Sequence, residues 1–111
     1  MSGIVRLFPG TDFARLVNLY KGASVFDMSG ATAKARVVSA NSDDPLSDQV
    51  TLSSGATGAD WTNSKVALII PAAATASITA VGAARIEIMV TQGGVDDHWL
   101  MPIDIVKGHV S

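Results

Sequence analysis

Three carboxylates that lie close together in the sequence are the first candidates for chemistry. Asp43, Asp44 and Asp48 occupy one acidic segment, and calcium binds several carboxylate and carbonyl oxygens at once. The segment lacks the alternating ligands, the central glycine and the closing glutamate of an EF-hand loop. We therefore interpret these residues as solvated turn residues and predict that the protein holds no metal ion.

A second candidate is the run Asp96-Asp97-His98, which places two carboxylates beside an imidazole. Such groups can form a metal site or an acid–base pair. The run follows a Gly-Gly turn in a segment with the pattern of a strand, where adjacent side chains point to opposite faces. We interpret it as the polar shoulder of a hairpin, and His109 as a surface residue.

Motifs for covalent catalysis or phosphate binding are not found in the sequence. A serine nucleophile needs a base and an orienting acid, but the chain has two histidines, one glutamate and no Gly-x-Ser-x-Gly motif. The segment Gly55-Ala56-Thr57-Gly58 is not followed by the lysine of a P-loop. The chain has no cysteine, which excludes disulfides and thiol chemistry. We predict a protein that is not an enzyme and has no cofactor.

Trp61 and Trp99 could form an aromatic platform for a sugar ring. Trp99 alternates in phase with Ile103 and Ile105, so we predict that it lies in the core. Trp61 follows a glycine-rich loop, and its role stays open. A glycan-binding adhesin domain that uses Trp61 is therefore the alternative from a different functional class.

Length and charge limit the classes of partner. The 111 residues predict a single domain over residues 1–111, since a domain averages about 150 residues. Charged residues make up 16% of the chain, against about 25% in an average soluble domain, which indicates that something other than water covers part of the surface. The net charge of −2 leaves no large basic face, so we predict no nucleic-acid partner.

Residues 66–84 are uncharged and long enough to span a bilayer. Pro71, three hydroxyl residues and many alanines interrupt this segment or gain little from lipid. We predict a strand, a short helical turn and a second strand there, and no membrane partner. Arg6 and Pro9 interrupt the early apolar residues, so no ordinary secretory signal is expected.

Alternation of apolar and polar residues predicts about seven short strands. They cover residues 4–8, 13–20, 32–38, 49–53, 65–70, 85–91 and 99–105. Residues 71–76 begin with proline and predict one or two helical turns. This number and spacing of strands predicts an all-β, immunoglobulin-like antiparallel β-sandwich.

Several turn motifs punctuate these strands, at residues 8–13 (FPGTDF), 26–35 (FDMSGATAKA), 70–75 (IPAAAT) and 84–94 (ARIEIMVTQGG). Their order resembles that of small immunoglobulin-like domains of bacteriophage tail, baseplate and fibre proteins. The resemblance covers nearly the whole chain. It implies a virion structural protein, a non-enzymatic assembly or attachment module made in the host cytoplasm. The implied partners are other virion structural proteins and multiple copies of the chain itself. A capsid decoration (cement) protein on the head surface is the alternative within this class.

Several large apolar residues fall opposite the main apolar stripes, so a lone sandwich would expose them. They are Val5, Leu7, Leu16, Ile69, Leu100 and Val106. Pro102 cannot donate a ladder hydrogen bond, which predicts a sheet edge or a bulge at that position. We predict that the N-terminal strand and this edge strand contact other subunits. The candidate interface residues are Ile4, Val5, Leu7, Phe8, Leu100, Pro102 and Val106.

Overall fold

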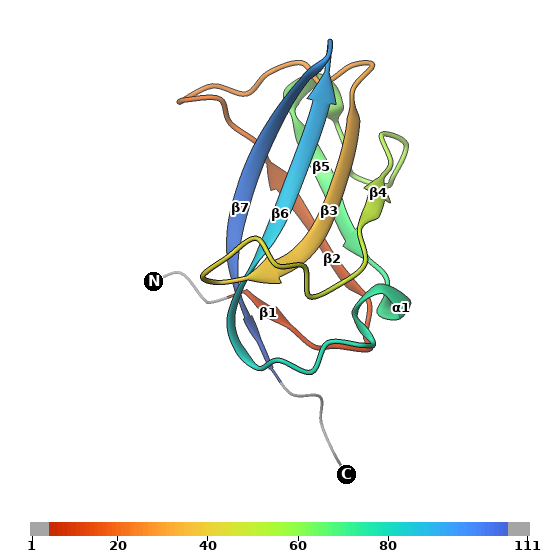
Figure 1. Cartoon of the computed structure of the whole chain (residues 1–111). Helices are drawn as coiled ribbons and strands as arrows, with labels where there is room; N and C mark the ends of the chain where they lie inside the picture. Colours follow the sequence, from red (N-terminus) through yellow and green to blue (C-terminus); the bar gives the residue numbers. More distant parts are fainter. Residues whose placement is uncertain (1–4, 107–111) are drawn as a thin grey trace.

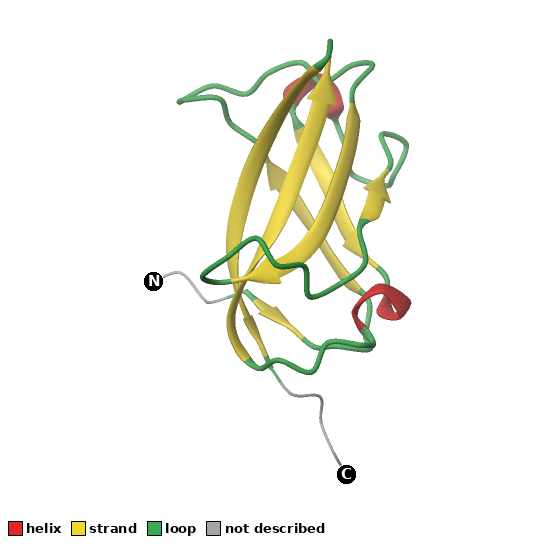
Figure 2. Cartoon of the chain, in the orientation of Figure 1, coloured by secondary structure: helices red, strands yellow, loops and turns green. Residues whose placement is uncertain are grey.

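The structure is a computed structural model that describes residues 5–106, and these residues form mainly β-strands (Figures 1 and 2). The strands are β1 (Arg6–Leu7), β2 (Phe13–Asn18), β3 (Thr32–Ser39), β4 (Val50–Leu52), β5 (Lys65–Ile70), β6 (Gly82–Gln92) and β7 (Val95–Ile105). A short α-helix, α1 (Ala72–Thr75), and a 3-10 turn, η1 (Trp61–Asn63), complete the described elements. The predicted all-β fold and the helical turn after Pro71 are confirmed.

The strands form two sheets that lie face to face (Figure 1). The larger sheet has the order β1-β7-β6-β3-β4, and the smaller sheet pairs β2 with β5. All pairs are antiparallel except β1 and β7, which run parallel. The parallel pairing of β1 with β7 departs from the predicted antiparallel sandwich, because the alternation within a strand carries no information about the direction of its neighbour.

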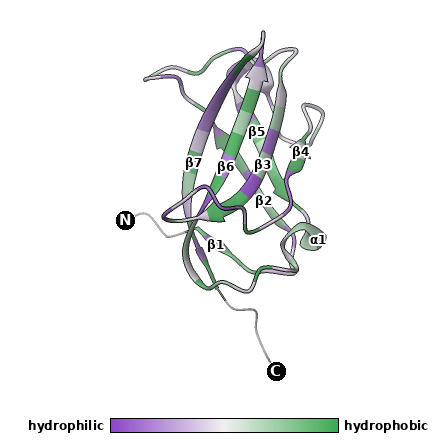
Figure 3. Cartoon of the chain, in the orientation of Figure 1, coloured by the Kyte–Doolittle hydropathy of each residue, from purple (hydrophilic) through white to green (hydrophobic). Residues whose placement is uncertain are grey.

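The core lies between the two sheets and is made by alternate residues of each strand. In β6, Ile86, Ile88 and Val90 are buried, while the residues between them face outward, and Figure 3 shows this alternation of hydropathy along the strand. In the smaller sheet, Leu68 and Ile70 fill the same core from the other side. Each such aliphatic side chain contributes about 1.5–3 kcal/mol through its burial.

A two-residue turn joins β6 to β7. Gly93 and Gly94 both have positive φ, at 61° and 80°, which is the backbone that a tight hairpin turn requires. Pairing runs without a bulge from Gln92 and Val95 at the turn to the far ends of both strands. Because Asp104 donates to the carbonyl of Val5 on the β1 side, the nitrogen of Pro102 faces that side too, where no described residue pairs with it.

The segment considered as a possible membrane span contains β5, α1 and the start of β6. At the start of α1, the amide of Ala72 donates to Asp12 Oδ1 at 2.8 Å. The hydroxyl of Thr75, a fully buried residue, accepts from the amide of Gly10 at 3.0 Å. Within residues 5–106, no helix has the length and apolar character that a membrane crossing requires.

Candidate interaction surface

The burial of Leu7 corrects one expected interface residue. Leu7 is 1% exposed, so its predicted position on the outer face is wrong. Parallel pairing places Leu7 opposite Ile105 of β7, and both side chains belong to the core. A strand of two residues is too short for its own alternation to show which side faces the core.

The other expected interface residues differ in their exposure to solvent. Phe8 and Leu100 are 42% and 47% exposed, and Pro102 is exposed as well. Val5 and Val106 are half-buried, whereas Ile4, like His109, lies outside the described residues. The structure therefore leaves three of these residues free for contact, while their role in an interface stays a prediction.

Charged side chains dominate the outer face of the larger sheet around Leu100. Its cross-strand neighbour Glu87 accepts a 2.9 Å hydrogen bond from Arg36 Nε. The other carboxylate oxygen of Glu87 lies 3.4 Å from His98 Nδ1. Leu100 is thus a single apolar side chain beside a polar network.

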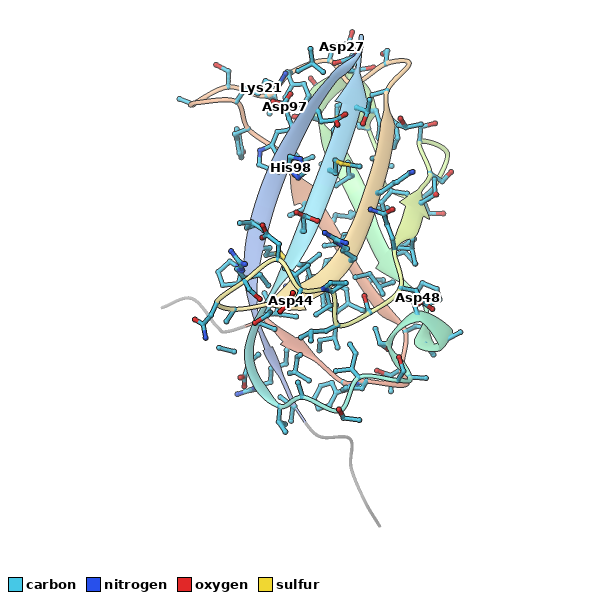
Figure 4. The ribbon with its side chains drawn as sticks, in the orientation of Figure 1. Lys21, Asp27, Asp44, Asp48, Asp97 and His98 are labelled. Atoms are coloured by element: carbon cyan, nitrogen blue, oxygen red, sulfur yellow. The ribbon has the colours of Figure 1, made fainter. Side chains whose placement is uncertain are left out.

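The acidic candidates do not converge on one point. Asp97 forms a 2.9 Å ion pair with Lys21, whereas His98 faces Glu87 on the opposite side of the strand. Figure 4 shows Asp44 and Asp48 well apart, the latter close to α1. Residues 5–106 hold no group of three histidine or acidic side chains that could bind a metal ion.

The outer face of the smaller sheet is apolar over two of its residue pairs and ends in the polar pair Asn18 and Lys65. We call Ala14, Leu16, Ala67 and Ile69 the outer apolar face, because they alternate with the core residues of β2 and β5. Ala14 lies opposite Ile69, and Leu16 lies opposite Ala67. Leu16 is 55% exposed and Ile69 is 43% exposed. Two large aliphatic side chains on neighbouring strands therefore meet solvent together.

Two shallow hollows adjoin this face and share Ala67 and Ile69. The larger, of about 310 Å³, extends toward β4 and is lined by Val50, Thr51, Leu52, Ser53, Ala56, Ala67, Ile69 and Pro71. The smaller, of about 160 Å³, extends over β2 and is lined by Ala14, Arg15, Leu16, Thr57, Ala67 and Ile69. Concave apolar surface of this kind is typical of sites that receive apolar side chains.

Arg15 places a positive charge on the strand that forms the free edge of the smaller sheet, β2. The amide of Leu19 donates to the carbonyl of Ser64, so the odd-numbered residues of β2 direct their main chain toward β5. The even-numbered residues direct theirs to an edge with no strand beside it. Arg15 shares a face with the core residues Phe13 and Val17 but is exposed. A charge at such a position discourages edge-to-edge pairing of strands, so contact through the face is favoured.

Both tryptophans pack against the core. Trp99 stacks on Phe26 with ring centroids 5.6 Å apart, and its Nε1 donates to the carbonyl of Tyr20 at 2.9 Å. The Nε1 of Trp61 is buried and has no hydrogen-bond partner among the described residues. The predicted packing of Trp99 is therefore confirmed, and the Trp61 N–H is not accessible to a sugar hydroxyl.

Of three comparisons with known proteins, the one with solved structures found matches. No protein-family model and no curated protein matches the chain. Six chains of solved structures match it, and one of them is the N-terminal domain of phage TP901-1 ORF48. The two share a TM-score of 0.59 and 12% identity over 96% of this chain and 86% of the other. This chain has the fold of a phage domain. At that identity, the likeness concerns the fold alone.

The outer apolar face was only partly visible in the sequence. Alternation predicted that Leu16 and Ile69 point outward, and their exposure confirms this. No pattern in the sequence predicts that β2 pairs with β5, and this pairing brings the two side chains together. The hollows also depend on the loop of residues 53–59, whose path is a tertiary feature.

Proposed function

We propose that this protein is a structural module of a bacteriophage virion, in its tail, baseplate or fibre region. In this role it is not an enzyme and acts through contact with other virion proteins. The observation that carries the proposal is the likeness, over 96% of the chain, to the N-terminal domain of phage TP901-1 ORF48. The motif resemblance to small phage domains supports the same role.

The strand order supports the immunoglobulin-like part of the proposal. In immunoglobulin sandwiches, the second and fifth strands of the common core belong to one sheet, and the third, sixth and seventh belong to the other. Here β2 pairs with β5, and β3, β6 and β7 are neighbours in the larger sheet. The smaller sheet has only two strands, fewer than in the antibody domains.

The distribution of apolar surface supports an assembly role. Exposed apolar patches on a small domain mark sites of protein contact more often than chance. The outer apolar face has Leu16 and Ile69 beside two hollows, whereas the outer face of the larger sheet has an ion-pair network around Glu87. The small domain therefore has one face suited to water and one suited to a partner.

The proposal is tested on particles of the phage that encodes the protein. Mass spectrometry of purified particles should detect the chain, and gold-labelled antibodies against it should bind at the tail, baseplate or fibres. Labelling over the head surface would instead favour the capsid decoration role. Absence of the chain from washed particles would contradict a virion role of either kind.

The glycan-binding alternative has a separate test. Titration with sugars at millimolar concentration should give no binding if the protein is an assembly module. Binding that is lost in Trp61→Ala, in a variant that keeps its fold, would favour the adhesin function.

A further inference from the structure

Ala67 is buried although it lies on the outer apolar face. It is 4% exposed, whereas Ala14, a residue of the same size on the same face, is exposed. Each has one large aliphatic neighbour on the other strand, which is Leu16 for the first and Ile69 for the second. Such a neighbour alone therefore does not bury an alanine, and another segment of the chain covers Ala67.

The loop of residues 53–59, which we call the strap, is this cover. Ala56 lines the larger hollow, Thr57 lines the smaller one, and Ala67 borders both. The two strap residues follow each other in the chain, while one hollow extends toward β4 and the other over β2. The strap therefore crosses over Ala67 and divides the two hollows.

The strap reaches the outer face through a close contact at Gly58. A Cβ there would stand 2.9 Å from Leu16 Cδ1 and 3.0 Å from Leu16 Cδ2. The φ of Gly58 is +85°, a conformation that residues with a side chain rarely adopt. Glycine therefore allows the strap to close against Leu16, since another residue would be strained and crowded at this position.

The strap is held at its two ends and not between them. Before it, Leu52 is buried in β4. After it, the main chain of Asp60 forms two 2.9 Å hydrogen bonds with that of Lys65. Within residues 5–106, the strap itself forms hydrogen bonds only between its own residues. Segments with so few bonds to the rest of a protein open at a low cost in free energy.

The strap also lies beside the free edge of β5. Lys65 pairs with Asp60 on the side away from β2, so the odd-numbered residues of β5 direct their main chain to that side. No described residue pairs there with the main-chain groups of Ala67 and Ile69. Both residues line the larger hollow, which two residues of the strap also line. A loop that covers a strand edge hinders other strands from pairing with it.

We propose that the strap is a hinged cover of β5, which opens about Leu52 and Asp60 while the two sheets stay folded. When it is closed, it buries Ala67 and screens the free edge of β5. When it is open, it joins the two hollows into one apolar groove along that edge. This inference goes beyond the proposed function, because it concerns a motion within a single copy of the chain.

A single thiol beneath the strap measures the opening. The chain has no cysteine, so Ala67→Cys would carry the only thiol. A thiol reagent in excess should label it at a rate set by the open fraction, with little dependence on urea, because opening exposes little surface. Ile69→Cys, at an exposed position of the same strand, should be labelled without this delay.

The matched control is a thiol in the core. Ala35 of β3 is 1% exposed, and only unfolding of the sandwich would expose Ala35→Cys. Its labelling should be slower than that of Ala67→Cys by about 100-fold or more and should rise steeply with urea, as global unfolding does. Circular dichroism and thermal unfolding of each variant establish that it is folded.

Strap variants made in the Ala67→Cys protein test the hinge itself. Gly58→Ala should speed labelling by about tenfold, because strain in the closed strap favours the open form. Gly55→Ala should leave the rate unchanged, since its Cβ would have Ser53 Oγ as its nearest neighbour at 3.7 Å. Hydrogen exchange of the Ala67 amide, in chains without any cysteine, should show the same difference between the two glycine variants.

Three outcomes would overturn the inference. The first is labelling of Ala67→Cys as slow and as dependent on urea as that of Ala35→Cys, which would mean that the strap does not open by itself. The second is labelling as fast as that of Ile69→Cys, which would mean that nothing covers this position. The third is equal rates in the two glycine variants. None of them affects the detection of the chain in phage particles, so the two proposals can fail independently.

Discussion

The indole Nε1 of Trp99 donates a 2.9 Å hydrogen bond to the carbonyl oxygen of Tyr20. This bond joins β7 of the larger sheet to the chain that leaves β2 of the smaller sheet. Phe26, on the same loop, stacks on the Trp99 ring. Trp99 therefore holds the loop of residues 19–31 against the sandwich.

Substitution of Trp99 should separate the hydrogen bond from the packing. Trp99→Phe loses the N–H but keeps an aromatic ring, so the free energy of unfolding should fall by about 1 kcal/mol. Trp99→Ala also loses the packing and should cost about 2–4 kcal/mol. Urea unfolding measures both. Tyr20→Phe is the control, because only the main-chain carbonyl of Tyr20 accepts this bond. An unchanged stability of Trp99→Phe would contradict the role of the bond.

A negative charge should destabilise the protein far more at Leu7 than at Leu100. Leu7→Asp places a carboxylate in the core, since Leu7 is fully buried, and should cost about 3 kcal/mol or more. Leu100→Asp alters an exposed side chain and should change stability by less than about 0.5 kcal/mol. Thermal unfolding compares them. A stable Leu7→Asp protein would show that β1 does not pack as described.

Gly58 should tolerate substitution by alanine poorly, whereas Gly55 should tolerate it well. Gly58 has a φ of +85°, and a Cβ there would stand 2.9 Å from Leu16 Cδ1. Gly58→Ala should therefore cost about 1–2 kcal/mol, most of it backbone strain, because the exposed Leu16 side chain can shift. Gly55→Ala is the matched control, since its nearest neighbour would be Ser53 Oγ at 3.7 Å. Equal effects of the two substitutions on the melting temperature would argue against this account.

Asp27 should titrate below the ordinary aspartate range. The hydroxyl of Ser29, and then its amide, donate to the Asp27 carboxylate and lower its pKa from the ordinary value of 3.8. A carboxylate with a lowered folded-state pKa adds stability above its unfolded-state pKa. That stability is lost as the pH falls below 3.8 and through the folded-state value. Carboxyl chemical shifts followed by NMR should show this, and Ser29→Ala should return the Asp27 pKa toward its ordinary value.

Removal of metal ions should leave the protein unchanged. The carboxylates of residues 43–48 and those of Asp96 and Asp97 do not converge on one point. The described residues hold no cluster of three side chains that could bind a metal ion. The melting temperature in excess EDTA should therefore equal that in added calcium. A shift of several degrees between the two conditions would reveal a metal site.

The sequence by itself determined the strands and their turns, because these depend on neighbouring residues. The predicted strand over residues 65–70 matches the bounds of β5, and the Gly93-Gly94 pair forms the hairpin turn. Alternation also assigned Ile86 and Ile88 to the core and Leu16 and Ile69 to the outside, since side chains of a strand alternate between two faces.

Only the tertiary structure decided which strands are neighbours. The parallel pairing of β1 with β7 buries Leu7, and the pairing of β2 with β5 brings Leu16 and Ile69 together. The hollows follow from the same arrangement. Alternation assigns side chains to the faces of one strand, but the choice of neighbour depends on packing between segments far apart in the chain.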